Sequence, residues 1–595
     1  MSYLDLPRIN FGGTWTGNVA TANNNPFLVR PGTPKPQQTV LLDFANVRIS
    51  PAFDASEHLS DVELRQLMND EYGIDPRNWS YWGGNTASFD TRITSVNLGA
   101  GVTAADPLVG QPAGFVHTEL CDNNPTGSQS TQMFSDAFSL AGVGLDAGPR
   151  SPSRWVWFFR NKDLLTSHVP AASASGVFQT VLPIDAAGWQ GLLAIGSPAI
   201  VALHAAWQAA GAKAAGLSIR YGLFATLREA TGPTVVRSAL VSGSIGLATT
   251  DELASFPNCR TLYDPAGQNA PVLLQVDQVR KIVSVDLFNA LPETGMTHAT
   301  LAKVPQGDLT LQLTGGGGAP VIVGTITPAQ YSMANVNQQG SVVDLDYRSV
   351  AGPVDAALSG GASFQLAANV GGSVFHEDFW AATDQRNYYL QNFQDGAITV
   401  KVMANGQPVA NTPLFLQQFV VDYADDNAND VGGSQPDAPA AWLCAMNDQT
   451  STDANGIATV RLSAKATGNC VIRFTLAPDV NAINMQRDGF ANIRILPSDD
   501  YAHITDAMLA GQAGFELMYK TVLRYYYLTF PVMQSIVDFS NYQVMTNARV
   551  LQMLLAATDP AGWGTYGYMP RTRDLSEPRH TLLARWVKVQ QTPIA

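Results

Sequence analysis

The sequence contains little charge, and most of that charge is negative. Asp, Glu, Lys and Arg make up 14% of the 595 residues, whereas typical soluble domains contain roughly 25%. The 49 acidic residues outnumber the 35 Lys and Arg residues, so the net charge is −14 at pH 7. A negative chain repels the phosphate backbone of nucleic acids. We therefore expect no nucleic-acid partner.

Cysteine is also scarce, and no two cysteines are close in the sequence. The four residues are Cys121, Cys259, Cys444 and Cys470, and none belongs to a CxxC pair. This spacing excludes a zinc ribbon, a thioredoxin-type site and a dense disulfide framework. We expect four reduced thiols that behave as small buried side chains.

Signals for export, for a membrane span and for several hydrolase classes are missing as well. No basic segment followed by an apolar run opens the sequence, and the longest apolar stretch, 195–210, is interrupted by Gly196, Pro198 and His204. The motifs GxSxG and HExxH do not occur, which argues against an elbow-type serine hydrolase and a zincin. We expect a cytoplasmic protein without a membrane span.

The abundant features are turn residues and short alternating runs. The 51 Gly and 35 Pro residues separate runs rich in Val, Ile, Thr and Phe, a spacing that favours antiparallel sheets over βαβ units. Two helices are predicted before residue 500. Ser60 and Glu63 have capping-box spacing at the start of 60–70, and Pro198 and Gly211 delimit an alanine-rich helix. The predicted strands lie in 39–49, 217–226, 272–288, 309–313, 321–326 and 341–346.

Two further units follow. Residues 395–497 contain strands joined by Asn-Gly and other Gly turns, and this pattern resembles bacterial immunoglobulin-like sandwich modules. From residue 498 onwards, apolar residues recur at helical spacing. We predict an α+β, predominantly antiparallel, multi-domain fold. Its units are a β-rich region of one or two subdomains (1–392), an immunoglobulin-like sandwich (393–497) and a helical C-terminal region (498–595).

An acidic loop is one candidate metal site. Asp422, Asp425, Asp426 and Asp430 lie within nine residues, and calcium takes six to eight oxygen ligands. The EF-hand spacing fails, because Asp430 occupies the position of the required glycine. The loop therefore has two interpretations, a cation site and a solvated sandwich loop.

A second candidate is His376 with Asp378 and Asp384. Imidazole and carboxylate ligands together bind iron or zinc if all of them face one point. On a strand, His376 and Asp378 share a face. A ferritin-like di-iron site is not indicated, because the only ExxH pattern, from Glu577 to His580, contains Pro578.

Tyrosines cluster in the segment 519–527. On a helix, Tyr519 and Tyr526 lie on one face. Tyrosine phenolates ligate haem iron, and a nearby cation such as Arg524 stabilises the phenolate. Tyr525 and Tyr526 are then the candidate axial ligands. The alternative is a packed aromatic helix whose hydroxyls meet backbone carbonyls.

Several uncommon strings, in one order from residue 4 to about 580, resemble the chromopyrrolate synthase family. These are the enzymes of the violacein and rebeccamycin pathways that couple two tryptophan-derived imines. The strings are LDLPRINFGGTW, TANNNP, IRYGLF, DELASFP, VPQGDLTLQL, GSVVDLD, ILPSDDY, YYYLTFPVM and GYMPRTRDLSEPR.

The resemblance is to the N-terminal half of those larger enzymes, without their ferritin-like half. It implies a role in tailoring amino-acid-derived natural products, with an aromatic small molecule or a separate ferritin-like protein as the partner. Some members are described as haem-containing, which makes haem a candidate cofactor. The catalase-type Arg-to-Tyr spacing is not matched, because Leu528 stands four residues after Arg524. Two alternatives stay open, a non-catalytic scaffold protein and an exported binding module or toxin component. The sequence leaves open whether the chain is an enzyme.

Overall fold

The protein is described by a computed structural model. Within the residues that it describes, no helix has both the length and the apolar character needed to cross a membrane. The described residues are 1–18, 27–28, 39–53, 59–72, 85–125, 130–145, 150–158, 174–231, 234–265, 269–288, 290–291, 293–294, 298–315, 319–370, 372, 374–423, 431 and 433–591.

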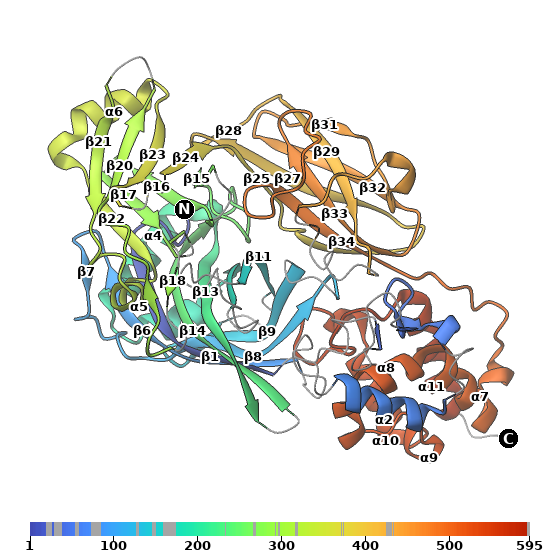
Figure 1. The fold of residues 1–595 in the computed structure, drawn as a ribbon. Coiled ribbons are helices and arrows are strands. Elements are labelled where there is room, and N and C mark those ends of the chain that lie inside the picture. Colours follow the sequence, from blue (N-terminus) through green and yellow to red (C-terminus); the bar gives the residue numbers. More distant parts are fainter. Residues whose placement is uncertain are drawn as a thin grey trace.

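A ten-stranded antiparallel sheet forms the first part of the molecule (Figure 1). It closes on itself, because β1 pairs with β14 on one side and with β6 on the other. Apolar side chains of the strands and of two helices fill its core. In sheet order the strands are β1 (Arg8–Asn18), β14 (Thr234–Thr249), β13 (Ala214–Thr231), β12 (Ala174–Leu182), β11 (Arg150–Phe158), β9 (Thr131–Leu140), β8 (Ala113–Asp122), β6 (Thr86–Asn97) and β7 (Val102–Thr103), with β10 (Val143–Leu145) beside β9.

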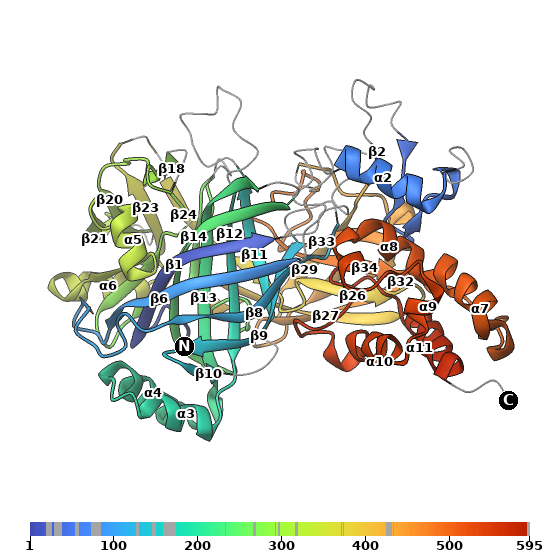
Figure 2. The same ribbon diagram turned by 90° about the horizontal axis from the view of Figure 1, so that it is seen from below.

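The helices whose apolar side chains join the core of this sheet are α3 (Ala186–Leu193) and α4 (Pro198–Ala210) (Figure 2). The predicted bounds of α4 are confirmed. Ser197 accepts a hydrogen bond from the Ile200 amide at 3.2 Å, Pro198 occupies the first turn, and Gly211 ends the helix.

An eight-stranded sheet with its own core lies beside the closed sheet. Helix α6 (Ala351–Ser359) packs on it. Helix α5 (Met333–Gln339) lies between it and the closed sheet, where Ser95 and Ser242 donate to carbonyls of α5. The predicted strands 309–313 and 321–326 are confirmed, and they form the antiparallel pair β20–β21. In sheet order the strands are β21 (Val321–Ile326), β20 (Leu309–Thr314), β23 (Ser363–Ala368), β24 (Val374–Asp378), β15 (Arg260–Tyr263), β16 (Val272–Asp277), β17 (Ile282–Asp286) and β22 (Val342–Asp346).

Two five-stranded sheets face each other across a shared apolar core and form a sandwich. Two of their strands precede residue 393, since β25 pairs with β27 and β26 pairs with β34. One sheet contains β25 (Trp380–Ala382), β27 (Asp395–Ala404), β32 (Ile457–Ala464), β30 (Cys444–Ala445) and β28 (Gln407–Pro408). The other contains β26 (Asn387–Gln391), β34 (Gly489–Leu496), β33 (Gly468–Thr475), β29 (Pro413–Val420) and β31 (Gln449–Ser451).

The C-terminal region is helical, as predicted, and packs with a segment from the N-terminal part of the chain (Figure 1). That segment contains α2 (Asp61–Tyr72), whose start has the predicted capping box: Ser60 N–H donates to Glu63 at 2.8 Å. The other helices are α7 (Gly511–Met518), the π-helix η9 (Tyr519–Leu523), α8 (Arg524–Thr529), α9 (Tyr542–Met545), α10 (Ala548–Ala557) and α11 (Glu577–Gln591).

Short elements complete the described structure. The 3₁₀ turns are η5 (Gly211–Lys213), η6 (Arg348–Val350), η7 (Pro439–Ala441), η8 (Asp506–Leu509), η10 (Pro531–Ser535) and η11 (Pro560–Gly562). The two-stranded ribbons are β2 (Phe27–Leu28) with β3 (Thr39–Val40), β4 (Leu42–Asp43) with β5 (Arg48–Ile49), and β18 (Glu293–Thr294) with β19 (Ala302–Lys303). The chain is therefore β-rich and mostly antiparallel, as expected.

Candidate functional site

An apolar cavity of about 440 Å³ lies in the helical region. Ligand pockets are typically 300–1,000 Å³, mostly apolar, and contain a few placed polar groups. We name it the helical cavity. Its lining residues are Thr86, Val522, Leu523, Tyr526, Phe530, Val532, Met533, Ile536, Phe539, Met553, Leu554, Ala557, Thr558, Tyr566, Gly567, Met569, Pro570, Arg571, Leu575 and Leu583.

Five helical segments (η9, α8, η10, α10 and α11) and the loop 566–571 contribute most of the lining of this cavity. The π-helix η9 contributes Val522 and Leu523, and α8 continues with Tyr526. A π-helix widens one turn of a helix, and such turns are frequent at functional sites. Met553 and Ala557 lie four residues apart on α10 and therefore face the same side. The loop 566–571 brings the cavity to the closed sheet, where Thr86 lies opposite Glu119 in the β6–β8 register.

One polar wall of the helical cavity is the Tyr526 hydroxyl with its partner Asp574. The hydroxyl donates to the Asp574 carboxylate at 3.2 Å, and Thr572 donates to the same oxygen at 2.6 Å. Burial raises the pKa of Asp574 above its usual range. Burial and the nearby Asp574 carboxylate raise the pKa of Tyr526. The raised pKa keeps Tyr526 a neutral hydrogen-bonding group at pH 7.

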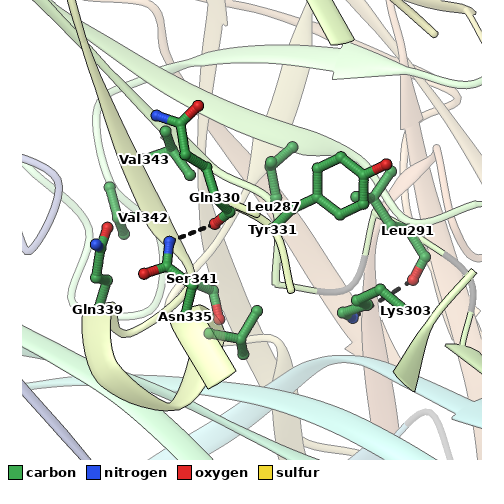
Figure 3. A pocket seen from close by; sticks show the side chains of 11 residues that line it. Leu287, Leu291, Lys303, Gln330, Tyr331, Asn335, Gln339, Ser341, Val342 and Val343 are labelled. Atoms are coloured by element: carbon green, nitrogen blue, oxygen red, sulfur yellow. Dashed lines mark hydrogen bonds between the residues drawn. The ribbon is translucent and has the colours of Figure 1, made fainter. Parts of the chain in front are cut away.

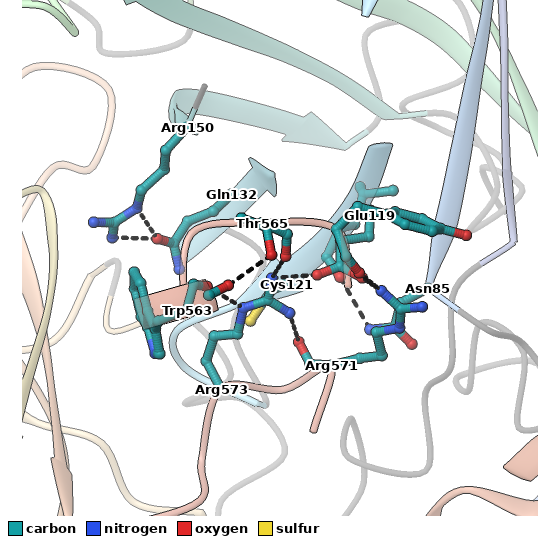
Figure 4. Close-up of polar contacts among 12 residues, drawn as sticks. Asn85, Glu119, Cys121, Gln132, Arg150, Trp563, Thr565, Arg571 and Arg573 are labelled. Carbon is teal, nitrogen blue, oxygen red and sulfur yellow. Dashed lines mark hydrogen bonds and ion pairs between the residues drawn. The ribbon is translucent and has the colours of Figure 1, made fainter. Parts of the chain in front are cut away.

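The other polar group at the cavity is Arg571, which lines it and shares a buried carboxylate with a second guanidinium group (Figure 4). Glu119 on β8 is fully buried and forms ion pairs with both Arg571 and Arg573. Arg573 is itself fully buried and also donates to the carbonyls of Trp563 and Thr565, at 3.1 and 2.8 Å. Burial raises the pKa of Glu119 to about 7, although the two arginines pull it down.

A hydrogen-bonded chain extends from these residues toward the sandwich. Arg150 on β11 donates to Gln132 at 2.7 Å, and Gln132 donates to the Tyr389 hydroxyl of β26 at 3.0 Å. The thiol of Cys121 lies 3.7 Å from the same hydroxyl. Burial raises the pKa of Cys121 to about 12, so its thiol is protonated at neutral pH and is not an activated nucleophile.

The predicted tyrosine cluster is only partly brought to the cavity. Tyr526 lines it, whereas Tyr519 and Arg524 both bind Asp61 of α2, at 2.7 and 2.8 Å. Tyr525 is buried, and burial together with the Asp574 carboxylate raises its pKa. The expected helix is a π-helix over 519–523 and an α-helix from Arg524.

The candidate haem ligands Tyr525 and Tyr526 are protonated phenols in this structure, and haem ligation stays a prediction. Ligation requires a phenolate, but both Tyr525 and Tyr526 have raised pKa values beside a carboxyl group. Arg524, which was expected to stabilise the phenolate, is held by Asp61 instead.

The predicted metal ligands His376, Asp378 and Asp384 do not come together in the structure. Among the described residues, no three His, Cys, Asp or Glu side chains come together as a metal-binding group. His376 lies 3.4 Å from the Gln365 amide, and Asp378 pairs with Arg487. Asp384 accepts hydrogen bonds from the amides of the 254–255 loop, at 3.0 and 2.8 Å.

The acidic loop lies mostly outside the described residues. Asp425, Asp426 and Asp430 are among the residues that are not described, so the calcium hypothesis stays a prediction. Asp422 lies beside a groove of about 350 Å³ at the edge of the sandwich.

A small cavity in the eight-stranded sheet is not a second ligand site (Figure 3). Its volume is about 10 Å³, which is room for about one water molecule. Lys303 on its wall is fully engaged: its ammonium group donates to Glu293 and to the Phe288 carbonyl, at 2.7 and 2.9 Å.

Of the polar groups at the helical cavity, the sequence pointed to Tyr526 but not to Arg571, nor to the buried residues behind these two. Arg571, Arg573 and Asp574 all stand in the string GYMPRTRDLSEPR, one of those on which the family resemblance rests. That string was the available signal. Glu119 gave none, because its role depends on a contact between residues more than 450 positions apart.

No family model matches the chain. Among curated proteins it is similar to the 2-imino-3-(indol-3-yl)propanoate dimerase of Chromobacterium violaceum, with 23% identity over 665 aligned positions. The alignment covers 99% of this chain and 58% of that enzyme. The chain therefore spans little more than half the length of this relative. This distant similarity agrees with the family resemblance in the sequence.

Proposed function

We propose that this chain binds 2-imino acids derived from aromatic amino acids and takes part in their coupling. The observation that carries the proposal is the helical cavity, which combines an apolar interior with a cationic group on its wall. An indole-type ring fits an apolar lining of Met, Phe and Leu side chains, since polarizable and aromatic groups pack well against rings. The distant relative is named for dimerising a compound of this class.

Three properties of the cavity suit such a ligand: apolar walls, a neutral hydrogen-bonding group and a positive charge. Its apolar walls keep out water, and exclusion of water protects reactive intermediates from hydrolysis. The Tyr526 hydroxyl supplies a neutral hydrogen-bonding group, because Asp574 and burial keep it protonated. The Arg571 guanidinium supplies a positive charge.

The coupling partner is part of the proposal. We propose that a ferritin-like protein or segment supplies the iron chemistry implied by the family resemblance. Three predictions from the sequence stand beside this proposal. They are the cytoplasmic location, the immunoglobulin-like character of the sandwich, and the domain boundaries at residues 393 and 498.

The binding part is tested by calorimetric titration of the full chain with indole-3-propanoate, a stable analogue without the imine. Wild-type protein is expected to bind one equivalent. Ala557→Phe places a ring in the cavity and should reduce the affinity at least tenfold. Ala556→Phe is the matched control, because Ala556 is exposed on the same helix. Absence of binding by the wild type, or equal losses in both variants, would contradict the proposal.

The coupling part needs a separate test. The full chain is mixed with a purified ferritin-like partner and with 2-imino-3-(indol-3-yl)propanoate generated in situ. A coupled product that requires both proteins supports the proposal. If the product forms at the same rate without this chain, the chain takes no part in the coupling reaction.

A further inference from the structure

Arg571 presents unused hydrogen-bond donors to the helical cavity. Its side chain is 14% exposed and lines the cavity. Among the residues that the structure describes, its hydrogen bonds all run through Nη1, which donates to Glu119 and to the Tyr566 carbonyl. A guanidinium group carries five N–H donors in a rigid fork. The edge formed by Nε and Nη2 is therefore left for a ligand.

The guanidinium group is also held in place before any ligand arrives. Its central carbon lies 4.5 Å from the centre of the Tyr566 ring, a stacked cation–π arrangement. The backbone amide of Tyr566 donates in turn to Asp136 on β9, at 3.1 Å. A fixed donor edge loses little entropy on binding and is therefore effective in recognition.

More positive than negative side chains contact or lie near Glu119. Arg571 and Arg573 share this one carboxylate. Arg150 and Arg573 both stack on Phe134, with ring-centre distances of 5.6 and 4.3 Å, so a third guanidinium group lies nearby. The hydrogen bonds of Arg150 within the described residues go to the neutral oxygens of Gln132 and Asn387. A ligand anion at Arg571 would reduce this excess positive charge.

We propose that Arg571 recognises the carboxylate of the ligand in the helical cavity, and that Glu119 is the internal counter-ion that limits its affinity for anions. This inference rests on the proposed function and specifies the chemical class of the ligand more narrowly. The ligand class becomes a planar aromatic ring joined by a short chain to a carboxylate, with the carboxylate on the Nε and Nη2 edge. Two parallel N–H···O bonds of this kind are strong and directional.

The test compares two ligands that differ only in charge. The full chain is titrated with indole-3-propanoate and with its neutral amide, indole-3-propanamide. Wild-type protein is expected to prefer the acid by roughly tenfold to a hundredfold, the range of a charge-assisted hydrogen bond. Arg571→Gln should make the two affinities equal. Arg585→Gln, a cation of α11 that pairs with Asp506, is the control that keeps the preference.

Each outcome decides between the two proposals. If neither ligand binds the wild type, the proposed function fails and this inference fails with it. If both bind the wild type equally well, the cavity is a binding site but Arg571 does not recognise the carboxylate. If Arg571→Gln does not fold, Glu119→Gln takes its place. Removing the counter-ion should strengthen the acid preference at least threefold, and an unchanged or weaker preference would overturn the inference.

Discussion

Two buried carboxylates in this molecule have opposite surroundings. Asp286 pairs with Arg220 at 2.7 Å and also accepts hydrogen bonds from the Tyr3 hydroxyl and the Phe288 amide, at 2.8 and 2.9 Å. These contacts join β13 of the closed sheet to β17 of the eight-stranded sheet. Glu119 shares two arginines, and one of them lines a cavity.

The comparison distinguishes an ion pair that supports the architecture from one that borders a candidate binding site. At Asp286 both partners are buried, and the carboxylate is saturated by groups of the protein. At Glu119, the second arginine, Arg571, lines a cavity large enough for a ligand, and its hydrogen bonds within the described residues leave Nε and Nη2 unused. Burial of charge alone is therefore a poor indicator of function, and unused hydrogen-bonding capacity beside a cavity is a better one.

The largest expected effect is at the architectural pair. Arg220→Met leaves Asp286 buried without its cation, so the free energy of unfolding should fall by about 3–5 kcal/mol. Urea denaturation monitored by circular dichroism measures the change. Arg348→Met is the control, because the Arg348–Asp346 pair is exposed, and its midpoint should stay at the wild-type value. A similar midpoint for Arg220→Met would refute the architectural role.

The next effect distinguishes the two arginines of Glu119. Arg573→Met removes a fully buried cation and its bonds to two carbonyls, so stability should fall by about 3–5 kcal/mol. Arg571→Met should cost clearly less, since its side chain borders the cavity and part of its hydrogen-bonding capacity is unused. The same denaturation experiment compares them. Equal losses would mean that Arg571 is as architectural as Arg573.

The pH dependence of stability is the third effect. The pKa of Glu119 is raised from 4.5 to about 7 by burial. A raised carboxyl pKa means that the folded state holds its proton more tightly than the unfolded state. The stability of the wild type should therefore fall as pH rises from about 4.5 through about 7, by about 3 kcal/mol in total. Glu119→Gln should lack this component between pH 5 and 8. A difference between the two proteins that grows with pH in favour of the wild type would contradict the sign.

The smallest effect is at the other wall of the cavity. Tyr526→Phe removes a hydroxyl that donates to Asp574, while Thr572 still donates to that carboxylate. Stability should fall by about 0.5–1.5 kcal/mol. Arg524→Gln, on the same helix but bonded to Asp61, tests the cluster away from the cavity. Only Tyr526→Phe should weaken binding of indole-3-propanoate, and an equal effect of Arg524→Gln would argue against the hydroxyl's role.

Local elements could be predicted because their signals are local. The α4 helix has the expected first and last residues, since Pro198 and Gly211 mark its ends, and Ser60 caps α2 as expected. Alternation with Gly and Pro turns predicted the antiparallel strands. The π-helix over 519–523 was not predicted, because its widened turn has no distinct sequence period.

The site could not be predicted, because its parts are distant in the chain. Arg571, from the C-terminal region, lines the cavity, and its partner Glu119 comes from β8. Similarly, α2 packs against α8 and provides Asp61, the partner that removes Arg524 from any role at a phenolate. Proximity in sequence suggested a cluster of Tyr519, Arg524 and Tyr526, whereas the tertiary packing divides it between two places.

The most direct test of the account is a crystal structure of the full chain with indole-3-propanoate. The account predicts ligand density in the helical cavity, with the ring against Met553 and Leu554 and the carboxylate on the Nε and Nη2 edge of Arg571. Density elsewhere on the molecule with the cavity empty, or a ligand whose carboxylate points away from Arg571, would contradict it.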